Sequence, residues 1–429
     1  MSLRLRCRAA LDADGRVRSP VCWSIEGGRT LALERDPSPG AATGTDTEAW
    51  NTLLVPGLVN AHAHLDLAGS EAVPAGQDFP EWLLGIGAAR QSAEGVREAA
   101  GAQAAALGAA GVCAIGDIDG TTGEGTRGRR DAGVAGRSYL EIVGVNPESA
   151  RRRLVESLRL VDLLGGGADE LGLSPHAPYS VHMDVLPEIA RAATARGLPL
   201  AMHLAETEEE TRYLTHGDGP FERFLQTIDR GRPFDRPPGL RPVALAEAVG
   251  LLAAGCVVIH GNDLSDDDIE LLAGRPAPVV YCHGTHRHFE RPAHRLLDLI
   301  AAGVTVAFGT DSGASNQGVD VFAELCRLAA DRPDVPPLAI LEGATAGGRA
   351  ALRLPRGPEI FAAGSSADGL LVGPLPEGLE TGPPEALAEW MFSGQARPLC
   401  TIHGGRLQEP VQMPPDGRAG FLDSLPGHG

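Results

Sequence analysis

Lysine is absent from the sequence, so all 37 basic residues are arginine. Chemistry that needs a lysine amine, such as a Schiff base with a carbonyl substrate, is therefore excluded. Cysteine is scarce, and no two cysteines form a C-x-x-C pair. An odd number of scattered cysteines argues against a disulfide framework or a structural zinc knuckle and favours a reducing compartment. The seven are Cys7, Cys22, Cys113, Cys256, Cys282, Cys326 and Cys400.

Long apolar runs and excess positive charge are also lacking. No stretch of roughly 18 uncharged apolar residues occurs, and the N-terminus has no apolar core of a signal peptide, so we expect a cytoplasmic protein. The net charge of -19, from 37 basic and 56 acidic side chains, repels phosphate backbones and anionic membranes. The sequence therefore predicts a small-molecule substrate and neither a nucleic-acid nor a membrane partner. A homodimer stays open.

The two ends of the chain have β character. Short apolar segments such as Val21 to Ile25 and Ala367 to Val372 alternate with Gly-rich and Pro-rich turns. We expect the two ends to pair into one small domain.

Between the ends, apolar runs of strand length alternate with segments of helical composition such as Leu186 to Arg196. Eight such runs favour a (β/α)8 barrel over an open doubly wound sheet, and no G-x-G-x-x-G motif follows the first. Active sites of such barrels lie at the C-terminal ends of the strands. The runs are Leu53 to Val59, Gly111 to Ile118, Ser138 to Gly144, Leu171 to Pro175, Leu198 to Leu204, Cys256 to Ile259, Pro278 to Cys282 and Thr305 to Gly309.

Reactive side chains stand where four of these runs stop. They are His62 and His64 after the first run, His203 and Glu206 after the fifth, His260 after the sixth and Asp311 after the eighth. Side chains two apart on an extended segment point the same way, so His62 and His64 can reach one ion. Each residue alone could be a polar strand cap. Together, at the ends of four strands, they predict a ring-shaped active site.

Four motifs, in chain order, resemble the metal-dependent deaminase and chlorohydrolase branch of the amidohydrolase superfamily. They are Pro-Gly-Leu-Val-Asn-Ala-His62-Ala-His64, His203-Leu-Ala-Glu206-Thr, His260-Gly and Gly-Thr-Asp311-Ser. The resemblance covers essentially the whole chain and looks closest to aminodeoxyfutalosine deaminase-like proteins. It implies an α/β fold in which a (β/α)8 TIM barrel over residues 56–355 is flanked by a composite β-sandwich. Residues 1–55 and 356–429 would form that sandwich.

The resemblance implies one divalent metal ion, usually zinc and sometimes iron. Its ligands would be His62, His64, His203 and Asp311. Relatives with two metals bridge them with a carboxylated lysine on strand 4, and this chain has no lysine, so we expect a mononuclear site. His176 ends the fourth strand instead, in Pro-His-Ala-Pro-Tyr, and would contact the substrate.

The implied reaction is hydrolytic deamination of an amino-substituted heterocycle such as a purine nucleoside. A metal-activated water would attack the amine-bearing carbon and release ammonia. Glu206 would move the water proton, while His260 and Asp311 would hold the attacking water. A capping box, with Thr207 as the N-cap and Glu210 reaching back to it, predicts that Glu208 to Glu210 are solvated residues of a first helical turn and that Glu206 faces the barrel mouth.

Two further residues are predicted to contact substrate. His286 belongs to a second H-x-H motif in a predicted loop after the seventh run, and Trp82 lies in an aromatic-Pro-x-Trp-Leu stretch that covers the pocket in relatives. A chlorohydrolase or a cyclic-amide hydrolase similar to imidazolonepropionase uses nearly the same residues and stays open. A metal-free barrel that only binds is disfavoured, because such proteins lose ligands that are all present here.

Overall fold

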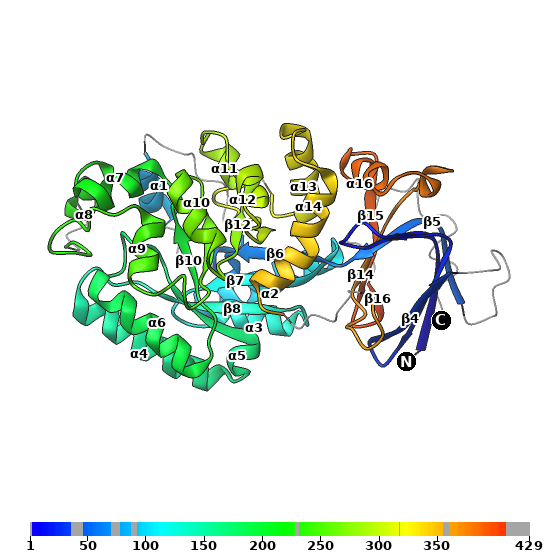
Figure 1. Ribbon diagram of the computed structural model, residues 1–429. Coiled ribbons are helices and arrows are strands. Elements are labelled where there is room, and N and C mark those ends of the chain that lie inside the picture. The colour runs from blue at the N-terminus through cyan, green and yellow to red at the C-terminus, as the bar shows by residue number, and fades with distance from the viewer. Residues whose placement is uncertain are drawn as a thin grey trace.

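The computed structural model describes residues 2–35, 46–69, 78–86, 92–227, 231–316, 318–354 and 361–408. Parallel strands surrounded by helices form one lobe, and a mixed sheet forms a second lobe beside it (Figure 1). No helix in these ranges is long and apolar enough to cross a membrane. All seven cysteines are free thiols. The predicted domain boundary between residues 355 and 356 lies outside the described ranges.

Strands from both ends of the chain lie in the mixed sheet. Strand β5 pairs antiparallel with β14, with Pro56 opposite Gly369 and Leu53 opposite Val372. On its other side β5 pairs parallel with β1. The order is β16-β15-β14-β5-β1-β3-β4, and β2 pairs with β1. The strands are β1 (Ser2–Leu11), β2 (Val17–Arg18), β3 (Val21–Glu26), β4 (Arg29–Arg35), β5 (Asp46–Pro56), β14 (Gly369–Gly373), β15 (Arg397–His403) and β16 (Arg406–Gln408).

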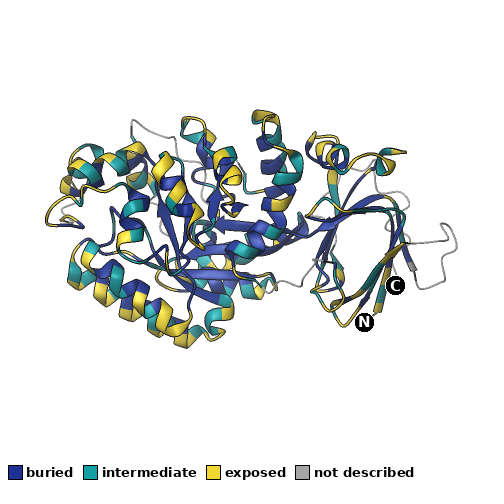
Figure 2. Ribbon diagram, viewed as in Figure 1, coloured by how far each residue is buried: buried dark blue, intermediate teal, exposed yellow. Residues whose placement is uncertain are grey.

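Eight parallel strands form two four-stranded sheets in the other lobe. They are buried along nearly their whole length, as expected for parallel strands that helices cover, and the exposed residues lie on the outer faces of the helices (Figure 2). Each of the eight runs predicted from the sequence overlaps one of them. The strands are β6 (Leu58–Ala63), β7 (Val112–Asp119), β8 (Ala135–Ile142), β9 (Leu171–Pro175), β10 (Ala201–Leu204), β11 (Val257–His260), β12 (Val279–Tyr281) and β13 (Val306–Phe308).

Two isolated parallel bridges connect the two four-stranded sheets. One joins Leu173 on β9 to Leu200 just before β10, and the other joins Ala63 at the end of β6 to Asp311 beyond β13. The Asp311 amide also donates to the His62 carbonyl at 3.0 Å. These contacts place the predicted metal ligands of the first and eighth strands next to each other.

Helices connect the parallel strands, and several have clear end signals. Asn146 caps α4 by accepting from the Ser149 amide, and α6 ends at Gly197, which has a φ of 67°. The helices are α1 (Phe79–Ile86), α2 (Ala93–Ala109), α3 (Glu124–Asp131), α4 (Pro147–Leu164), α5 (Gly167–Glu170), α6 (Leu186–Arg196), α7 (Glu208–His216), α8 (Pro220–Thr227), α9 (Pro242–Ala248), α10 (Asp266–Ala273), α11 (His283–His288), α12 (Leu296–Ala301), α13 (Val321–Asp331), α14 (Pro337–Glu342), α15 (Gly348–Ala351) and α16 (Pro384–Phe392). The short 3₁₀ helices are η1 (Leu65–Leu67), η2 (Met183–Val185) and η4 (Leu379–Thr381), and η3 (Gly343–Gly347) is a π-helix.

The prediction of a single strand over Leu53 to Val59 is wrong. The structure divides the run at Gly57: the part before it belongs to β5 in the mixed sheet, and Leu58 begins β6 in the parallel lobe. A Cβ at Gly57 would lie 2.9 Å from the Cβ of Cys113, so only glycine fits at this crossing. Both halves are buried and apolar, so the sequence pattern does not show the change of sheet.

Candidate metal and active site

The chain turns sharply where three of the parallel strands end. Ala205 after β10, His260 at the end of β11 and Asp311 beyond β13 have φ values of 52°, 74° and 58°. A non-glycine residue in this left-handed region costs about 1–3 kcal/mol, and such residues concentrate at functional sites. The turns lie at the carboxyl ends of the strands, where the sequence places the reactive residues.

Four imidazoles and one carboxylate converge at this end of the lobe. Ligand atoms of His62, His203 and His260 lie within 4.8 Å of one another, and so do those of His62, His64 and Asp311. The Nε2 atoms of His64 and His203 face each other at 3.2 Å. The structure therefore brings together all four predicted metal ligands and places His260 beside them.

The chemistry of this cluster fits a metal ion. Neither ring nitrogen of His62 has a hydrogen-bond partner among the described residues, although the side chain is buried. Burial lowers the pKa of both His62 and His203, which keeps them in the neutral form that binds metal. The Nδ1 of His203 lies 3.1 Å from the His176 carbonyl and donates to it, which leaves the Nε2 lone pair facing the cluster.

His64 lies among carboxylates. Its Nδ1 is 3.7 Å from Asp66 Oδ1, and its Nε2 is 3.7 Å from Asp311 Oδ1. Burial lowers the pKa of His64, but these two carboxylates together with Glu141 raise it to about 9. These carboxylates make the surroundings of His64 favourable to positive charge, and a bound cation would displace the proton from its imidazole.

Asp311 is held in one orientation by three hydrogen bonds. The hydroxyls of Thr285 and Ser315 donate to its Oδ2 at 3.1 and 3.0 Å, and the Ser312 amide donates to its Oδ1 at 2.8 Å. Burial opposes ionisation, but the His62 imidazole, 3.5 Å away, and the neighbouring histidines hold the pKa of Asp311 well below its usual range. The side chain is therefore an oriented, ionised carboxylate, as a metal ligand must be.

Glu206 is a buried carboxyl beside the cluster, with a 6% exposed side chain. Its Oε1 lies 3.6 Å from His260 Nε2. Burial raises the pKa of Glu206 well above its usual range, so this group can hold a proton near neutral pH. Its backbone is fixed by Asn262, whose Nδ2 donates to the Glu206 carbonyl at 3.1 Å. These properties suit a general acid and base.

The prediction that Glu210 is solvated is wrong. Thr207 accepts from the Glu210 amide at 2.9 Å, as the predicted capping box requires. The buried Glu210 carboxylate reaches past Thr207 and accepts from the amides of Ala205 at 3.2 Å and Glu206 at 2.8 Å. The left-handed backbone at Ala205 ends the strand, so these two amides no longer donate to a neighbouring strand. Because they are buried, another acceptor must take the place of the strand carbonyls. Glu210 thus positions the backbone of Glu206.

His260 is a neutral imidazole, because burial lowers its pKa to about 3. Its carbonyl accepts a hydrogen bond at 3.0 Å from Nε2 of the buried His294. The His294 ring in turn stacks on Tyr281, with 4.1 Å between ring centroids. His294 therefore fixes the end of β11.

His176 lies next to the cluster but outside both groups of convergent ligand atoms. Its ring centroid is 5.0 Å from that of His203, and its Nδ1 is 2.7 Å from Ser180 Oγ. Its Nε2 is 3.9 Å from Glu141 Oε1. Substrate contact by His176 stays a prediction.

The segment that carries His286 is a helix, so the prediction of a loop is wrong. Helix α11 begins directly after β12, and the Glu324 carboxylate accepts from the Gly284 amide at 2.6 Å, which stabilises the first turn. His286 Nδ1 lies 3.2 Å from Asn262 Oδ1, beside the end of β11. Residues two apart on a helix point in different directions, and His288 joins no convergent ligand group among the described residues.

Trp82 lies in α1 and packs against aromatic rings. Its ring centroid is 5.5 Å from Phe79 and 4.9 Å from Phe289. The same buried cluster includes Ala177 and Ala314, which follow β9 and Asp311 in the chain. Trp82 therefore lies at the end of the lobe that carries the histidines, and its contact with substrate stays a prediction.

Sequence reasoning missed three acidic residues near the cluster. Asp117 on β7 accepts from the Leu65 amide at 2.9 Å and so fixes the turn that follows His64. Asp119 accepts from the amide of Thr126 at 2.7 Å. Glu141 on β8 has its pKa raised by burial to about 7. All three stand at strand ends, so the signal that identified Asp311 could have found them.

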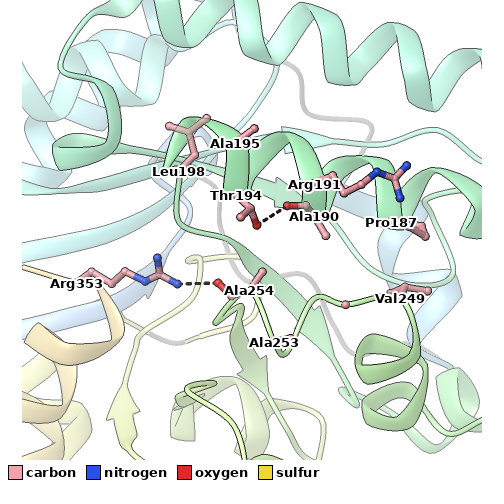
Figure 3. Close-up of a pocket in the computed structure, with 12 residues that line it drawn as sticks. Pro187, Ala190, Arg191, Thr194, Ala195, Leu198, Val249, Ala253, Ala254 and Arg353 are labelled. Carbon is pink, nitrogen blue, oxygen red and sulfur yellow. Dashed lines mark hydrogen bonds between the residues drawn. The ribbon is translucent and has the colours of Figure 1, made fainter.

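A cavity of about 710 Å³ lies away from this site (Figure 3). It is lined by α6, which precedes β10, and by residues between 249 and 254, which precede β11. The cavity therefore lies near the amino-terminal ends of these two strands. Arg353 donates to the Ala254 carbonyl at 2.8 Å beside it. In folds built from parallel strands and covering helices, active sites lie at the carboxyl ends of the strands, so the convergent histidines define the candidate site.

Comparisons with known proteins show the family and the fold of the chain. The profile of the Amidohydrolase family matches residues 53–407. An aminodeoxyfutalosine deaminase of Deinococcus radiodurans is 30% identical over 70% of this chain and 74% of its own length. A 5-methylthioadenosine/S-adenosylhomocysteine deaminase of Haloarcula marismortui is 30% identical over 78% of this chain and 76% of its own. The crystal structure of atrazine chlorohydrolase from Arthrobacter aurescens TC1, complexed with zinc, has a TM-score of 0.76 at 18% identity and covers 94% of each chain. It shares the TIM-barrel-type α/β fold.

Proposed function

Because the chain belongs to the amidohydrolase family, we propose that it is a metal-dependent deaminase that hydrolyses the amino group of an adenine nucleoside or a similar heterocycle. The observation that carries the proposal is the buried Glu206 carboxyl, 3.6 Å from His260 and beside the convergent histidines. Both curated relatives are named as deaminases of adenosine-like compounds. The chlorohydrolase shares the fold at low identity, which supports that reaction less directly.

We infer that His62, His64, His203 and Asp311 hold one ion, with zinc the best candidate. Three imidazoles and one carboxylate suit zinc and leave a position open for water. When bound, such an ion would lower the pKa of a water molecule to about 7. No lysine is present to bridge a second ion.

Glu206 and His260 then move and orient the reacting groups. The buried Glu206 accepts a proton from the attacking water and delivers it to the ring nitrogen next to the amine-bearing carbon. The neutral His260 orients the water against that carbon, where a carbon–oxygen bond forms. The second water proton goes to the departing amine as the carbon–nitrogen bond breaks, and ammonia and the heterocycle with a carbonyl in place of the amine are the products.

The same proposal includes the architecture around the site. The bridges from Leu173 to Leu200 and from Ala63 to Asp311 support a closed eight-stranded barrel over residues 56–355. The mixed sheet built from both chain ends supports a composite sandwich over residues 1–55 and 356–429. Its apolar cluster includes Trp23 and Phe361, with 5.3 Å between the ring centroids.

A substrate panel tests the function. Zinc-loaded protein should release ammonia from aminodeoxyfutalosine, 5′-methylthioadenosine, S-adenosylhomocysteine or adenosine, measured in a coupled assay together with the loss of adenine absorbance. Atrazine and a cyclic amide serve as the competing substrates. Chloride release from atrazine or ring opening of the amide, with no ammonia from any nucleoside, would replace the proposal by one of those reactions.

His176→Ala separates substrate contact from metal binding. We expect kcat/KM to fall by roughly 10- to 100-fold, because a hydrogen bond to a buried partner is typically worth about 1–3 kcal/mol. Metal content should stay at the wild-type level, since His176 lies outside the convergent ligand groups. Ser180→Ala, which removes only the Nδ1 partner of His176, is the milder companion variant. Loss of metal in His176→Ala would instead make this residue a ligand.

A further inference from the structure

Arg291 lies in the connection between α11 and α12, close to the active site. Its guanidinium carbon is 5.0 Å from the centroid of the Phe289 ring and 5.5 Å from that of Phe79 on α1. Burial has the largest effect on the pKa of Glu206 and raises it. The charge of Arg291 has the second largest effect and lowers that pKa. The guanidinium thus contacts two aromatic rings and is close enough to the proposed proton carrier to affect its charge.

This arginine has an unused pair of donors. Its side chain is only 13% exposed, and its Nε and Nη2 are buried without a hydrogen-bond partner among the described residues. The nearest carboxylate, Glu209, is 3.6 Å from the third nitrogen, Nη1. The Nε and Nη2 hydrogens point in the same direction and form the edge of a guanidinium that binds a carboxylate with two parallel hydrogen bonds.

A buried cation with unmet donors is costly unless a partner arrives. Burying a charged group without hydrogen bonds costs several kcal/mol, and the two aromatic faces offset only part of this. Arg137 in the same chain uses its donors on carbonyls, including that of Leu352, and other buried arginines such as Arg129 leave at most one nitrogen without a partner among the described residues, whereas Arg291 leaves both donors of one edge open. The open edge of Arg291 therefore points to a ligand that supplies the acceptors.

We propose that Arg291 binds a carboxylate carried by the substrate outside its heterocyclic ring, so that the enzyme prefers anionic adenine nucleosides to neutral ones. The proposal rests on the deaminase function and names the substrate class of that site. Phe79 and Phe289 pack against the guanidinium faces and keep its edge in place. Arg291 is a specificity-determining residue and takes no part in the proton transfers.

The test compares two substrates that differ only in charge. Aminodeoxyfutalosine, which carries a carboxylate, and its carboxamide are assayed for ammonia release with wild type, Arg291→Met and Arg291→Lys. Met keeps the length of the side chain but removes the donors, whereas Lys keeps the charge without the two-donor edge. Arg287→Met is the matched control, because Arg287 lies in the same segment, is 53% exposed and pairs with Asp331.

We expect wild type to prefer the carboxylate by about 10²-fold in kcat/KM, and Arg291→Met to lose that preference through the carboxylate substrate alone. Arg291→Lys should recover part of it, and Arg287→Met should behave as wild type. Calorimetry with the deaminated carboxylate product gives a second readout, in which Arg291→Met should weaken binding by a similar factor.

Two results would overturn the inference in different ways. Equal losses on both substrates in Arg291→Met, with wild-type metal content, would show that Arg291 acts on Glu206 or on packing, and the deaminase function would stand. Absence of turnover and of binding for every nucleoside in wild type would remove the inference together with the proposed function.

Discussion

Glu206→Gln is expected to lower ammonia release by about 10²- to 10⁴-fold, the usual contribution of a general acid and base. Glutamine keeps nearly the same shape but accepts no proton from the attacking water. The loss should appear in kcat, because the proton moves only in the transition state. Metal content should be unchanged, since Glu206 is not a proposed ligand. Steady-state kinetics and elemental analysis on the same preparation measure both.

Glu208→Gln is the control for that experiment. Glu208 lies two residues further along, in the exposed first turn of α7, and loses the same charge without touching the cluster. Turnover of Glu206→Gln at the level of this control, with metal bound, would eliminate Glu206 as the proton carrier. His260, 3.6 Å away, would then be the next candidate.

His203→Ala is expected to reduce the metal content from about one ion per chain to near zero, and activity with it. The His203 imidazole is a proposed metal ligand that the His176 carbonyl already orients. Without it, the three remaining proposed ligands hold an ion poorly. Inductively coupled plasma analysis after dialysis against a weak chelator gives the stoichiometry. The melting temperature gives a second reading, because a bound ion stabilises the folded state.

His288→Ala controls for the loss of one imidazole. It belongs to the second H-x-H motif, on α11, and should keep the full complement of metal. If His203→Ala kept its metal and His288→Ala lost it, the metal site would have to be assigned to α11 instead. Two tightly bound ions per wild-type chain would contradict the mononuclear site.

The strand ends could be predicted from the sequence because their signal is local. An apolar run that stops at His260 or Asp311 shows both the strand and its reactive end, and period-two spacing places His62 and His64 on one side. Asp117 and Glu141 also stand near strand ends, but an isoleucine follows each of them within β7 and β8, so the end of an apolar run marks them less clearly.

The contacts of Glu210 and Arg291 could not be predicted in this way. Glu210 has the sequence context of a solvated first-turn residue, and only the left-handed turn at Ala205 turns it toward two strand-end amides. The inference about Arg291 depends on its contact with Phe79, which is distant in the sequence, and on two donors that have no partner in the part of the chain that the structure describes. These contacts depend on tertiary packing, which local sequence patterns do not show.

The left-handed turns at His260 and Asp311 also affect how the protein can evolve. Asparagine or glycine would adopt those backbone angles at less cost, so drift under selection for thermal stability alone favours their replacement. Each such step would gain folding free energy while removing a reacting group. Histidine and aspartate persist there only while the reaction itself is under selection, and a lineage freed from that demand should lose these two residues early.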